Sequence, residues 1–192
     1  HRYQYAGVSA VLSLGTDPGT LPLQIRAEQE RNGGTLLRLA GRGIAAPDAG
    51  PGDPALKPSA YGVTTEEDLV QIADVVRGRD VAIFSDEPYC HMVWRGSHHS
   101  ILSQPGMLEQ SVAAYTLSKS YSMSGWRLGF AVASAEVADV ISKMINTTLS
   151  CTPPLVQLAG TAALKRDSKE RDDVMLKFRE KVVLLTDGLN RI

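Results

Sequence analysis

The chain has few cysteines, few aromatic residues and almost no net charge. Its 192 residues include 2 cysteines and 6% aromatic residues, and 20 basic residues nearly balance 21 acidic ones. Cys90 and Cys151 make no disulfide framework, so we expect a reducing, cytoplasmic setting, although a pairing between the two stays open. The balanced charge gives no basic field for nucleic acid or for an anionic membrane, so we expect small-molecule partners.

Long hydrophobic runs are missing as well. No apolar run reaches the length of about 18 residues that a membrane helix needs, and the N-terminus lacks a basic segment followed by an apolar one. The sequence therefore predicts no membrane span and no signal peptide. The content of 43% apolar and 21% charged residues is typical of a globular domain, and a first residue of His1 instead of methionine suggests a partial chain.

The chain does contain a clear helix pattern after residue 61. Thr64 and Glu67 have the spacing of a capping box, which predicts the start of a helix, and Gly78 predicts its end. The expected buried face of this helix carries Leu69, Ile72, Val75 and Val76. Residues 1–56 are poorly assigned, with a possible strand over 7–15 and a short helix over 21–34, and residues 41–58 are loop-like in composition.

Strand and helix patterns alternate in the rest of the chain. Apolar runs over residues 81–84, 111–117 and 128–134 predict strands, the first buried on both faces of a sheet and ending just before Asp86. Helical patterns follow over 135–149, 153–166 and 173–192. The last has an apolar stripe that predicts packing: Met175, Phe178, Val182, Leu185 and Leu189. We expect an α/β fold in which a mainly parallel sheet has helices on both faces.

Lys119 lies in an unusual segment, YTLSKSYSMSGWRLGF, which spans residues 115–130 and also contains Arg127. In open α/β sheets, ligands bind beyond the carboxyl ends of the strands, where we expect Asp86 and Lys119. A lysine amine at such a place can attack a carbonyl to form a Schiff base, and a guanidinium suits a phosphate. A lone lysine would most simply be solvated, but the hydroxyl residues and Arg127 around this one favour a phosphorylated aldehyde as the ligand.

These residues resemble the lysine signature of the class I/II, or fold type I, pyridoxal-phosphate-dependent aminotransferases. A small residue precedes the lysine, a Gly-x-Arg-x-Gly tail follows, and the arginine comes eight residues after the lysine. The matching residues are Ser118, Lys119, Gly125, Arg127 and Gly129. The Asp-x-x-Tyr element of the same family is matched upstream by Asp86 and Tyr89 in SDEPY.

The resemblance implies pyridoxal 5'-phosphate as the cofactor and a role for each matching residue. Lys119 would hold the aldehyde as a Schiff base and then move a proton, and Asp86 would keep the pyridine nitrogen protonated. Tyr89 would donate a hydrogen bond to the phenolate oxygen of the ring. The phosphate would be bound by Arg127, by Thr116 in place of the family's serine, and by Ser118 as a weaker candidate.

The sequence also departs from the family. The family's Asn-Pro-Thr-Gly element is replaced by a stretch that begins with Lys57, so its asparagine is lost. The resemblance assigns residues 57–170 to the core of the cofactor-binding large domain and 171–192 to the start of a linker helix to the small domain. The family's carboxylate-binding arginine has no match, because Arg191 lies too near the lysine signature.

Three functions therefore stay open on the sequence alone. The first is an aminotransferase that moves an amino group between an amino acid and a 2-oxo acid; the second is a lyase or decarboxylase on the same fold. The third is a truncated, non-catalytic relative that acts as a binding module. The family also implies a homodimer for the complete protein. No metal site is expected, because His91, His98 and His99 fit no zinc spacing.

Overall fold

The computed structural model describes residues 10–13, 20–32, 36–39, 43–45, 60–62, 65–94, 96–166 and 169–191. These residues belong to two compact units, one within residues 1–68 and the other within residues 69–192. Lys57, which replaces the expected asparagine, lies outside the described residues.

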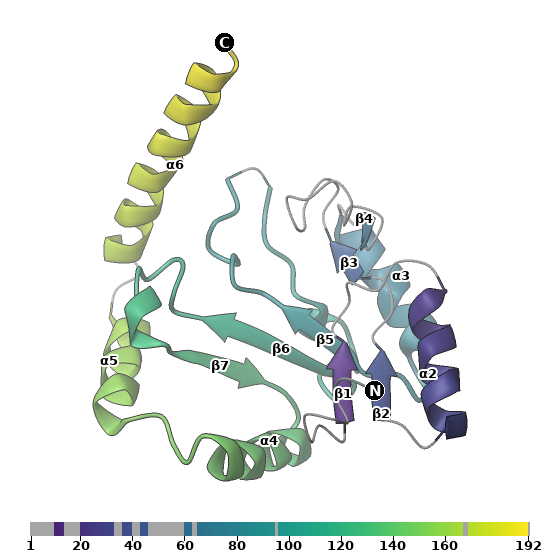
Figure 1. The fold of residues 1–192 in the computed structure, drawn as a ribbon. Helices are drawn as coiled ribbons and strands as arrows, with labels where there is room; N and C mark the ends of the chain where they lie inside the picture. The colour runs from purple at the N-terminus through teal and green to yellow at the C-terminus, as the bar shows by residue number, and fades with distance from the viewer. Residues whose placement is uncertain are drawn as a thin grey trace. The chain divides into compact units, whose positions relative to one another are not determined.

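The described residues of the first unit include helix α2 and two small parallel sheets. Strand β1 (Ala10–Ser13) pairs with β2 (Leu36–Leu39), and β3 (Gly43–Ala45) pairs with β4 (Ala60–Gly62). Helix α2 (Leu21–Asn32) lies alongside β2 in Figure 1. The strand and the helix that the sequence predicts in this region are confirmed. The loop-like composition of residues 41–58 was misleading, because β3 lies within it and depends on pairing with the distant β4.

Helix α3 (Glu66–Val76) begins one residue later than predicted. The N–H of Asp68 donates to Thr65 Oγ1 at 3.2 Å, and the N–H of Thr65 donates to Asp68 Oδ2 at 2.9 Å. The capping box is therefore formed by Thr65 and Asp68, and its placement at Thr64 and Glu67 was wrong. The short aspartate reaches back across the same three-residue interval, so either pair has an acceptable spacing. Gly78, with a φ of 74°, follows the helix end.

The buried face of α3 also differs from the prediction. Ala73 and Val76 are buried against Ile101 and Met107, with Leu69, Ile72 and Ile83 packed around them. Val75 is 59% exposed, so its assignment to the core was wrong. Positions 69, 72, 73 and 76 follow the three- and four-residue steps of one helix face, which leaves position 75 off that face.

The main sheet has the strand order β5 (Ile83–Asp86), β6 (Ser111–Thr116) and β7 (Gly129–Val132). Strands β5 and β6 are parallel, whereas β6 and β7 are antiparallel. The hydrogen-bonded pairing of β5 with β6 begins at Ile83, which lies opposite Ser111. The strand includes Asp86, whereas the sequence predicted that it ends just before this residue. Phe84 is 56% exposed, so the prediction of a strand buried on both faces was wrong. The predicted α/β class is confirmed.

Three helices follow the sheet: α4 (Ala135–Thr148), α5 (Pro154–Lys165) and α6 (Lys169–Leu189). Ser134 caps α4 through its hydroxyl, and Pro154 occupies the first turn of α5 as predicted. Gly160 of α5 is buried against the side chain of Leu128, which places this helix beside the start of β7. Short 3₁₀ turns η2 (Ile101–Ser103) and η3 (Ser124–Trp126) complete the unit.

Helix α6 extends away from the sheet, as Figure 1 shows. Met175 is buried, and Phe178 packs on Trp94 with 5.9 Å between the ring centroids. Leu185 and Leu189, at 65% and 70% exposure, are not packed, so the prediction of a buried stripe holds only at its N-terminal end. Within the described ranges, no helix combines the length and the apolar character that crossing a membrane requires.

Candidate functional site

The carboxyl ends of β5 and β6 meet at one edge of the sheet. Asp86 is the last residue of β5 and pairs with Ala114 of the parallel strand β6. Strand β6 ends at Thr116, three residues before Lys119. The structure thus brings the two predicted motifs to the edge where α/β proteins bind their ligands.

Lys119 is exposed between two buried neighbours. Leu117 and Ser120 are 1% and 2% exposed, so they fix the main chain on either side of the lysine. The turn is closed by the N–H of Ser122, which donates to the carbonyl of Lys119 at 3.0 Å, and by that of Met123, which donates to Leu117 at 3.1 Å. The backbone of Lys119 is therefore anchored while its amine is open to solvent.

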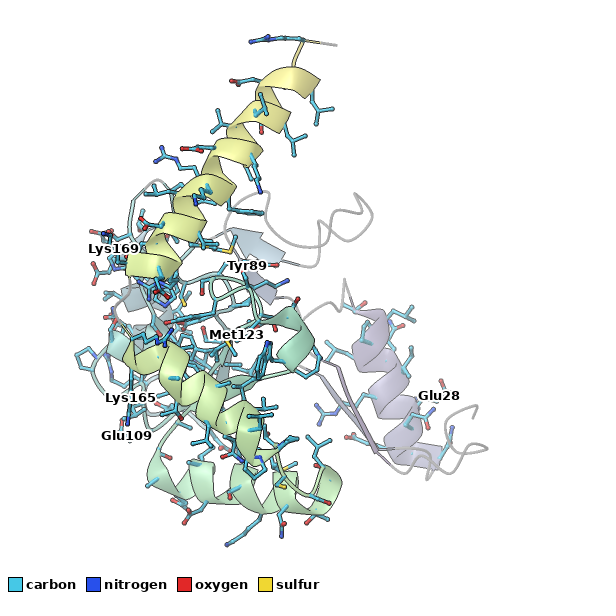
Figure 2. The ribbon with its side chains drawn as sticks, turned by 90° about the vertical axis from the view of Figure 1, so that its left-hand side faces the viewer. Glu28, Tyr89, Glu109, Met123, Lys165 and Lys169 are labelled. Carbon is cyan, nitrogen blue, oxygen red and sulfur yellow. The ribbon has the colours of Figure 1, made fainter. Side chains whose placement is uncertain are left out.

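The ring of Tyr89 lies beside this amine. The Nζ atom of Lys119 lies 5.3 Å from the centroid of the Tyr89 ring, a cation–π geometry. Tyr89 belongs to the turn that follows β5 and is labelled in Figure 2. Its ring is 55% exposed, so its surface is available to a ligand. The structure therefore joins the lysine signature to the Asp-x-x-Tyr element in space.

The charged residues of the site do not neutralise one another in the part of the chain that the structure describes. Asp86, Lys119 and Arg127 are all exposed, and none of them forms an ion pair with another described residue. Arg127 uses one donor, Nη1, which bonds to the carbonyl of Ser124 at 3.2 Å. A free carboxylate, amine and guanidinium match a ligand with a protonated ring nitrogen, an aldehyde and a phosphate. The donor set thus fits pyridoxal 5'-phosphate.

Arg127 has a strained backbone. Its φ of 53° lies in the left-handed region, which side chains with a Cβ rarely adopt. Such strain is concentrated at functional sites and persists where the surrounding structure enforces it. The conformation follows η3 directly, since Arg127 caps that turn.

The two glycines of the signature, Gly125 and Gly129, differ in how much space the structure leaves for a side chain. A Cβ atom on Gly129 would lie 2.5 Å from the carbonyl oxygen of Tyr115, so pairing between β6 and β7 excludes a side chain there. A Cβ atom on Gly125 would meet no atom within 4 Å. Gly129 is therefore required by the fold, whereas nothing in the described structure requires Gly125.

Thr116 and Ser118 are already linked to the protein. The hydroxyl of Thr116 donates to the carbonyl of Leu128 at 3.3 Å and accepts the N–H of Ser118 at 3.1 Å. These bonds hold the end of β6 to the start of β7. Thr116 would have to exchange the long bond to Leu128 in order to donate to a phosphate, so its predicted role stays a prediction.

A buried carboxylate next to Asp86 was missed by the sequence analysis. Glu87 is 6% exposed and accepts four hydrogen bonds. We call this residue and its four partners the Glu87 cluster: Ser85, Glu87, His98, Ser100 and Tyr115. Its Oε1 accepts from Ser85 at 2.9 Å and from Ser100 at 2.7 Å, and its Oε2 lies 2.7 Å from the Tyr115 hydroxyl and 2.9 Å from His98 Nε2. The sequence shows only an acid after Asp86, because the partners come from three separate segments.

The electrostatics of this cluster follow from its burial and its donors. Burial would raise the pKa of Glu87, but the hydrogen bonds from Ser100, Tyr115, His98 and Ser85 outweigh it, so the pKa lies below its ordinary value. Burial raises the pKa of Tyr115, and the Glu87 carboxylate adds to this effect. Glu87 is therefore charged and Tyr115 is neutral at pH 7.

A second polar group surrounds Arg171 at the start of α6. Its Nη1 donates to the Tyr121 hydroxyl at 3.3 Å and lies 3.5 Å from His91 Nε2, and its Nη2 pairs with Asp172 at 2.8 Å. Burial lowers the pKa of His91, and the charge of Arg171 lowers it further. His91 and His98 thus belong to different hydrogen-bonded groups, and the described residues contain no cluster of metal ligands.

Two cavities of the described structure are lined by other residues than the predicted cofactor residues. One of about 590 Å³ is lined by β7, α4 and α5, and another of about 320 Å³ is lined by residues 120–122 together with α5 and α6. Neither lining includes Asp86, Tyr89, Lys119 or Arg127. At the candidate site, Asp86, Tyr89, Lys119 and Arg127 are all exposed.

The chain matches a family model described as aminotransferase class I and II, over residues 62–192. Aspartate aminotransferase of Musicola paradisiaca is 33% identical over 131 residues, which cover 68% of this chain and 33% of that protein. LL-diaminopimelate aminotransferase of Syntrophobacter fumaroxidans is 34% identical over 133 residues, which cover 68% of this chain and 34% of that protein.

A solved structure shows the same likeness in three dimensions. Aromatic aminotransferase from Pyrococcus horikoshii is 32% identical with a TM-score of 0.61, and the match covers 67% of this chain and 35% of that one. The chain therefore spans about a third of the length of the relatives it matches. The matched part contains β5, β6 and β7 with all of the predicted cofactor residues.

Proposed function

Because the chain belongs to the class I and II aminotransferases, a family that depends on pyridoxal 5'-phosphate, we propose that its protein transfers amino groups between an amino acid and a 2-oxo acid. The proposed activity is that of the complete protein, because the chain spans about a third of its relatives' length. The exposed Lys119 amine over the Tyr89 ring is the observation that carries it.

Each predicted residue has a place in this proposal. Lys119 would supply the amine that holds the cofactor aldehyde and, once free, would move a proton at the α-carbon of the substrate. Asp86 would hold the pyridine nitrogen in its protonated form, and Tyr89 would donate a hydrogen bond to the ring oxygen. When bound, the cofactor supplies an electron sink for the substrate's α-carbon.

The phosphate of the cofactor would be held by Arg127, Thr116 and Ser118. Arg127 uses one guanidinium donor on the carbonyl of Ser124, and its other donors would bind the phosphate. Thr116 ends β6 and Ser118 follows it, and their hydroxyls would supply further donors, that of Thr116 in exchange for its bond to the carbonyl of Leu128. These three assignments rest on the motif and on the proximity of their segments along the 116–127 loop.

The relatives suggest which amino donors to test first. Those named above are aminotransferases for aspartate, LL-diaminopimelate and aromatic amino acids. We therefore propose an amino acid and a 2-oxo acid as substrates and leave the choice to a screen of these three classes. A homodimer and a cytoplasmic location stay predictions.

The first test asks whether the chain binds the cofactor at Lys119. The visible absorbance of the purified chain is recorded with pyridoxal 5'-phosphate before and after borohydride, and the reduced adduct is located by peptide mass. We expect one adduct, on Lys119. Labelling spread evenly over the exposed lysines would contradict the assignment.

The second test separates an aminotransferase from a lyase on the same fold. The protein is incubated with each amino donor, with and without a 2-oxo acid acceptor. An aminotransferase forms the new amino acid only when the acceptor is present, whereas a lyase consumes the donor without it. A chain with no adduct and no turnover would be a non-catalytic binding module.

A further inference from the structure

Glu87 is a buried charge that the proposed cofactor chemistry does not use. It follows Asp86 and precedes Tyr89 by two residues, yet its side chain belongs to the Glu87 cluster and not to the open site. Successive residues at a strand end point to opposite sides, so Glu87 points away from the side that carries the Asp86 carboxylate. We therefore consider which segments of the chain Glu87 connects.

Glu87 connects the ends of the two strands that carry the site. Its N–H donates to the carbonyl of Ala114 at 2.9 Å, which continues the pairing of β5 and β6 beyond Asp86. Its carboxylate accepts from the hydroxyl of Tyr115 at 2.7 Å. Tyr115 lies on β6, four residues before Lys119. One residue thus ties the Asp86 and Tyr89 segment to the strand that leads to the lysine.

The same carboxylate is held from a third segment. Ser100 donates to Oε1 at 2.7 Å, and its hydroxyl also accepts the N–H of Leu102 at the start of η2. His98 Nε2 lies 2.9 Å from Oε2. A buried carboxylate in a fully satisfied network makes a rigid junction, because losing one donor leaves a desolvated charge without compensation.

We propose that Glu87 is a positioning residue for the cofactor site. Its carboxylate fixes the end of β5 against β6 and thereby sets the placement of Asp86 and Tyr89 relative to Lys119. The role in cofactor binding rests on the proposed function. The coupling of the ends of β5 and β6 through Glu87 can be measured without the cofactor. Preorganised supporting residues of this kind keep a binding site in its productive geometry.

The first experiment measures the affinity of the chain for pyridoxal 5'-phosphate in the Glu87→Ala variant. We expect the dissociation constant to rise at least about tenfold, since the hydrogen bonds to a charged group are lost. The fraction trapped on Lys119 by borohydride at a fixed cofactor concentration should fall in parallel. Unchanged affinity and trapping would overturn the proposal.

Two control variants separate positioning from stability and from charge. Met107→Ala removes a fully buried side chain from the core beneath α3 and should lower the melting temperature with less than about a twofold effect on affinity. Glu109→Ala removes an exposed carboxylate and should change neither quantity. If Met107→Ala weakened binding as much as Glu87→Ala, the effect would be a general loss of stability and the proposal would fail.

Amide hydrogen exchange tests the link in the absence of cofactor. In Glu87→Ala we expect faster exchange over residues 86–92 and 117–123, whereas Met107→Ala should accelerate exchange in α3 without that pattern. Normal exchange in both segments would overturn the proposal, whatever the cofactor does. The expected pattern in a chain that forms no Lys119 adduct would sustain the link and reject the proposed function.

Tyr115→Phe provides a milder variant if Glu87→Ala fails to fold. It removes one donor to the carboxylate and keeps the ring stacked on Phe130, where the centroids are 5.2 Å apart. We expect weaker cofactor binding and faster exchange in the same two segments, each by a smaller factor than in Glu87→Ala. Wild-type behaviour in both measurements would contradict the proposed path through β6.

Discussion

The amine of Lys119 lies 5.3 Å from the centre of the Tyr89 ring, although the two residues are separated by η2, the whole of β6 and the loops between them. The parallel pairing of β5 and β6 brings them together, because it places both strand ends at the same edge of the sheet.

Lys119→Ala should abolish the borohydride-stable adduct and leave the fold intact. The side chain is exposed and its contact with Tyr89 is worth less than about 1 kcal/mol, so the free energy of unfolding should change little. Peptide mass spectrometry and urea unfolding give the two measurements. Lys143→Ala, which removes an exposed lysine on α4, should retain the adduct.

Tyr89→Phe and Tyr89→Ala separate the ring of Tyr89 from its hydroxyl. The phenylalanine variant keeps the aromatic face over the amine, so the adduct should persist while the visible spectrum of the bound cofactor and its pH dependence change. The alanine variant should also bind the cofactor several-fold less tightly. Identical spectra for the wild type and Tyr89→Phe would rule out the proposed contact of the hydroxyl with the ring oxygen.

Arg127→Gly should weaken cofactor binding without lowering stability. Glycine adopts the positive φ of this position freely, so the free energy of unfolding should stay the same or rise by up to about 1 kcal/mol. Affinity for pyridoxal 5'-phosphate should fall at least about tenfold, and affinity for pyridoxal, which lacks the phosphate, should not.

Ser150→Gly is the matched control for Arg127→Gly. Ser150 has a φ of 65° and lies between α4 and α5, so the substitution relieves similar strain away from the site. It should leave both affinities unchanged. An equal loss of both ligands in Arg127→Gly would show that the arginine shapes the loop and does not bind the phosphate.

Gly129→Ala should destabilise the chain, whereas Gly125→Ala should not. The added methyl at position 129 would press on the backbone oxygen of Tyr115, and overpacking of this kind costs about 1–3 kcal/mol. The space around position 125 is open. Thermal melts of the two variants measure the difference, and equal melting temperatures would show that β6 and β7 separate more easily than the structure implies.

Glu87 should make stability depend on pH in the acidic range. Because its folded-state pKa is lowered, its charged form stabilises the fold above the ordinary pKa of a glutamate, about 4.3, and this contribution is lost as the pH falls through the lowered value. Glu87→Gln should therefore be less stable than the wild type by about 1–3 kcal/mol at pH 7. The gap should shrink on acidification.

Urea unfolding at several pH values measures this gap. Glu109→Gln, at an exposed position labelled in Figure 2, should follow the wild type throughout. A gap between the wild type and Glu87→Gln that stays constant at low pH would mean that the shape of the side chain matters and its charge does not.

The sequence predicted those features that depend on neighbouring residues. The helices α4, α5 and α6 and the strands β6 and β7 follow local hydrophobic periods, and the lysine signature is a local motif. Their boundaries were less secure, as the shift of the capping box from Thr64 to Thr65 shows. Two adjacent threonines with acids three residues later offer nearly the same local energy, so packing of α3 on the core selects the register.

The sequence by itself thus determined the α/β class, the order of the elements from α3 onward and the identity of Asp86, Tyr89, Lys119 and Arg127 as candidates. Only the tertiary structure decided that Lys119 faces Tyr89, that Phe84 is exposed and that Glu87 is buried among four donors. The physical reason is the separation along the sequence of the residues that interact. A helix or a motif is encoded within a few residues, whereas burial and hydrogen bonding depend on groups that meet only when distant strands pair.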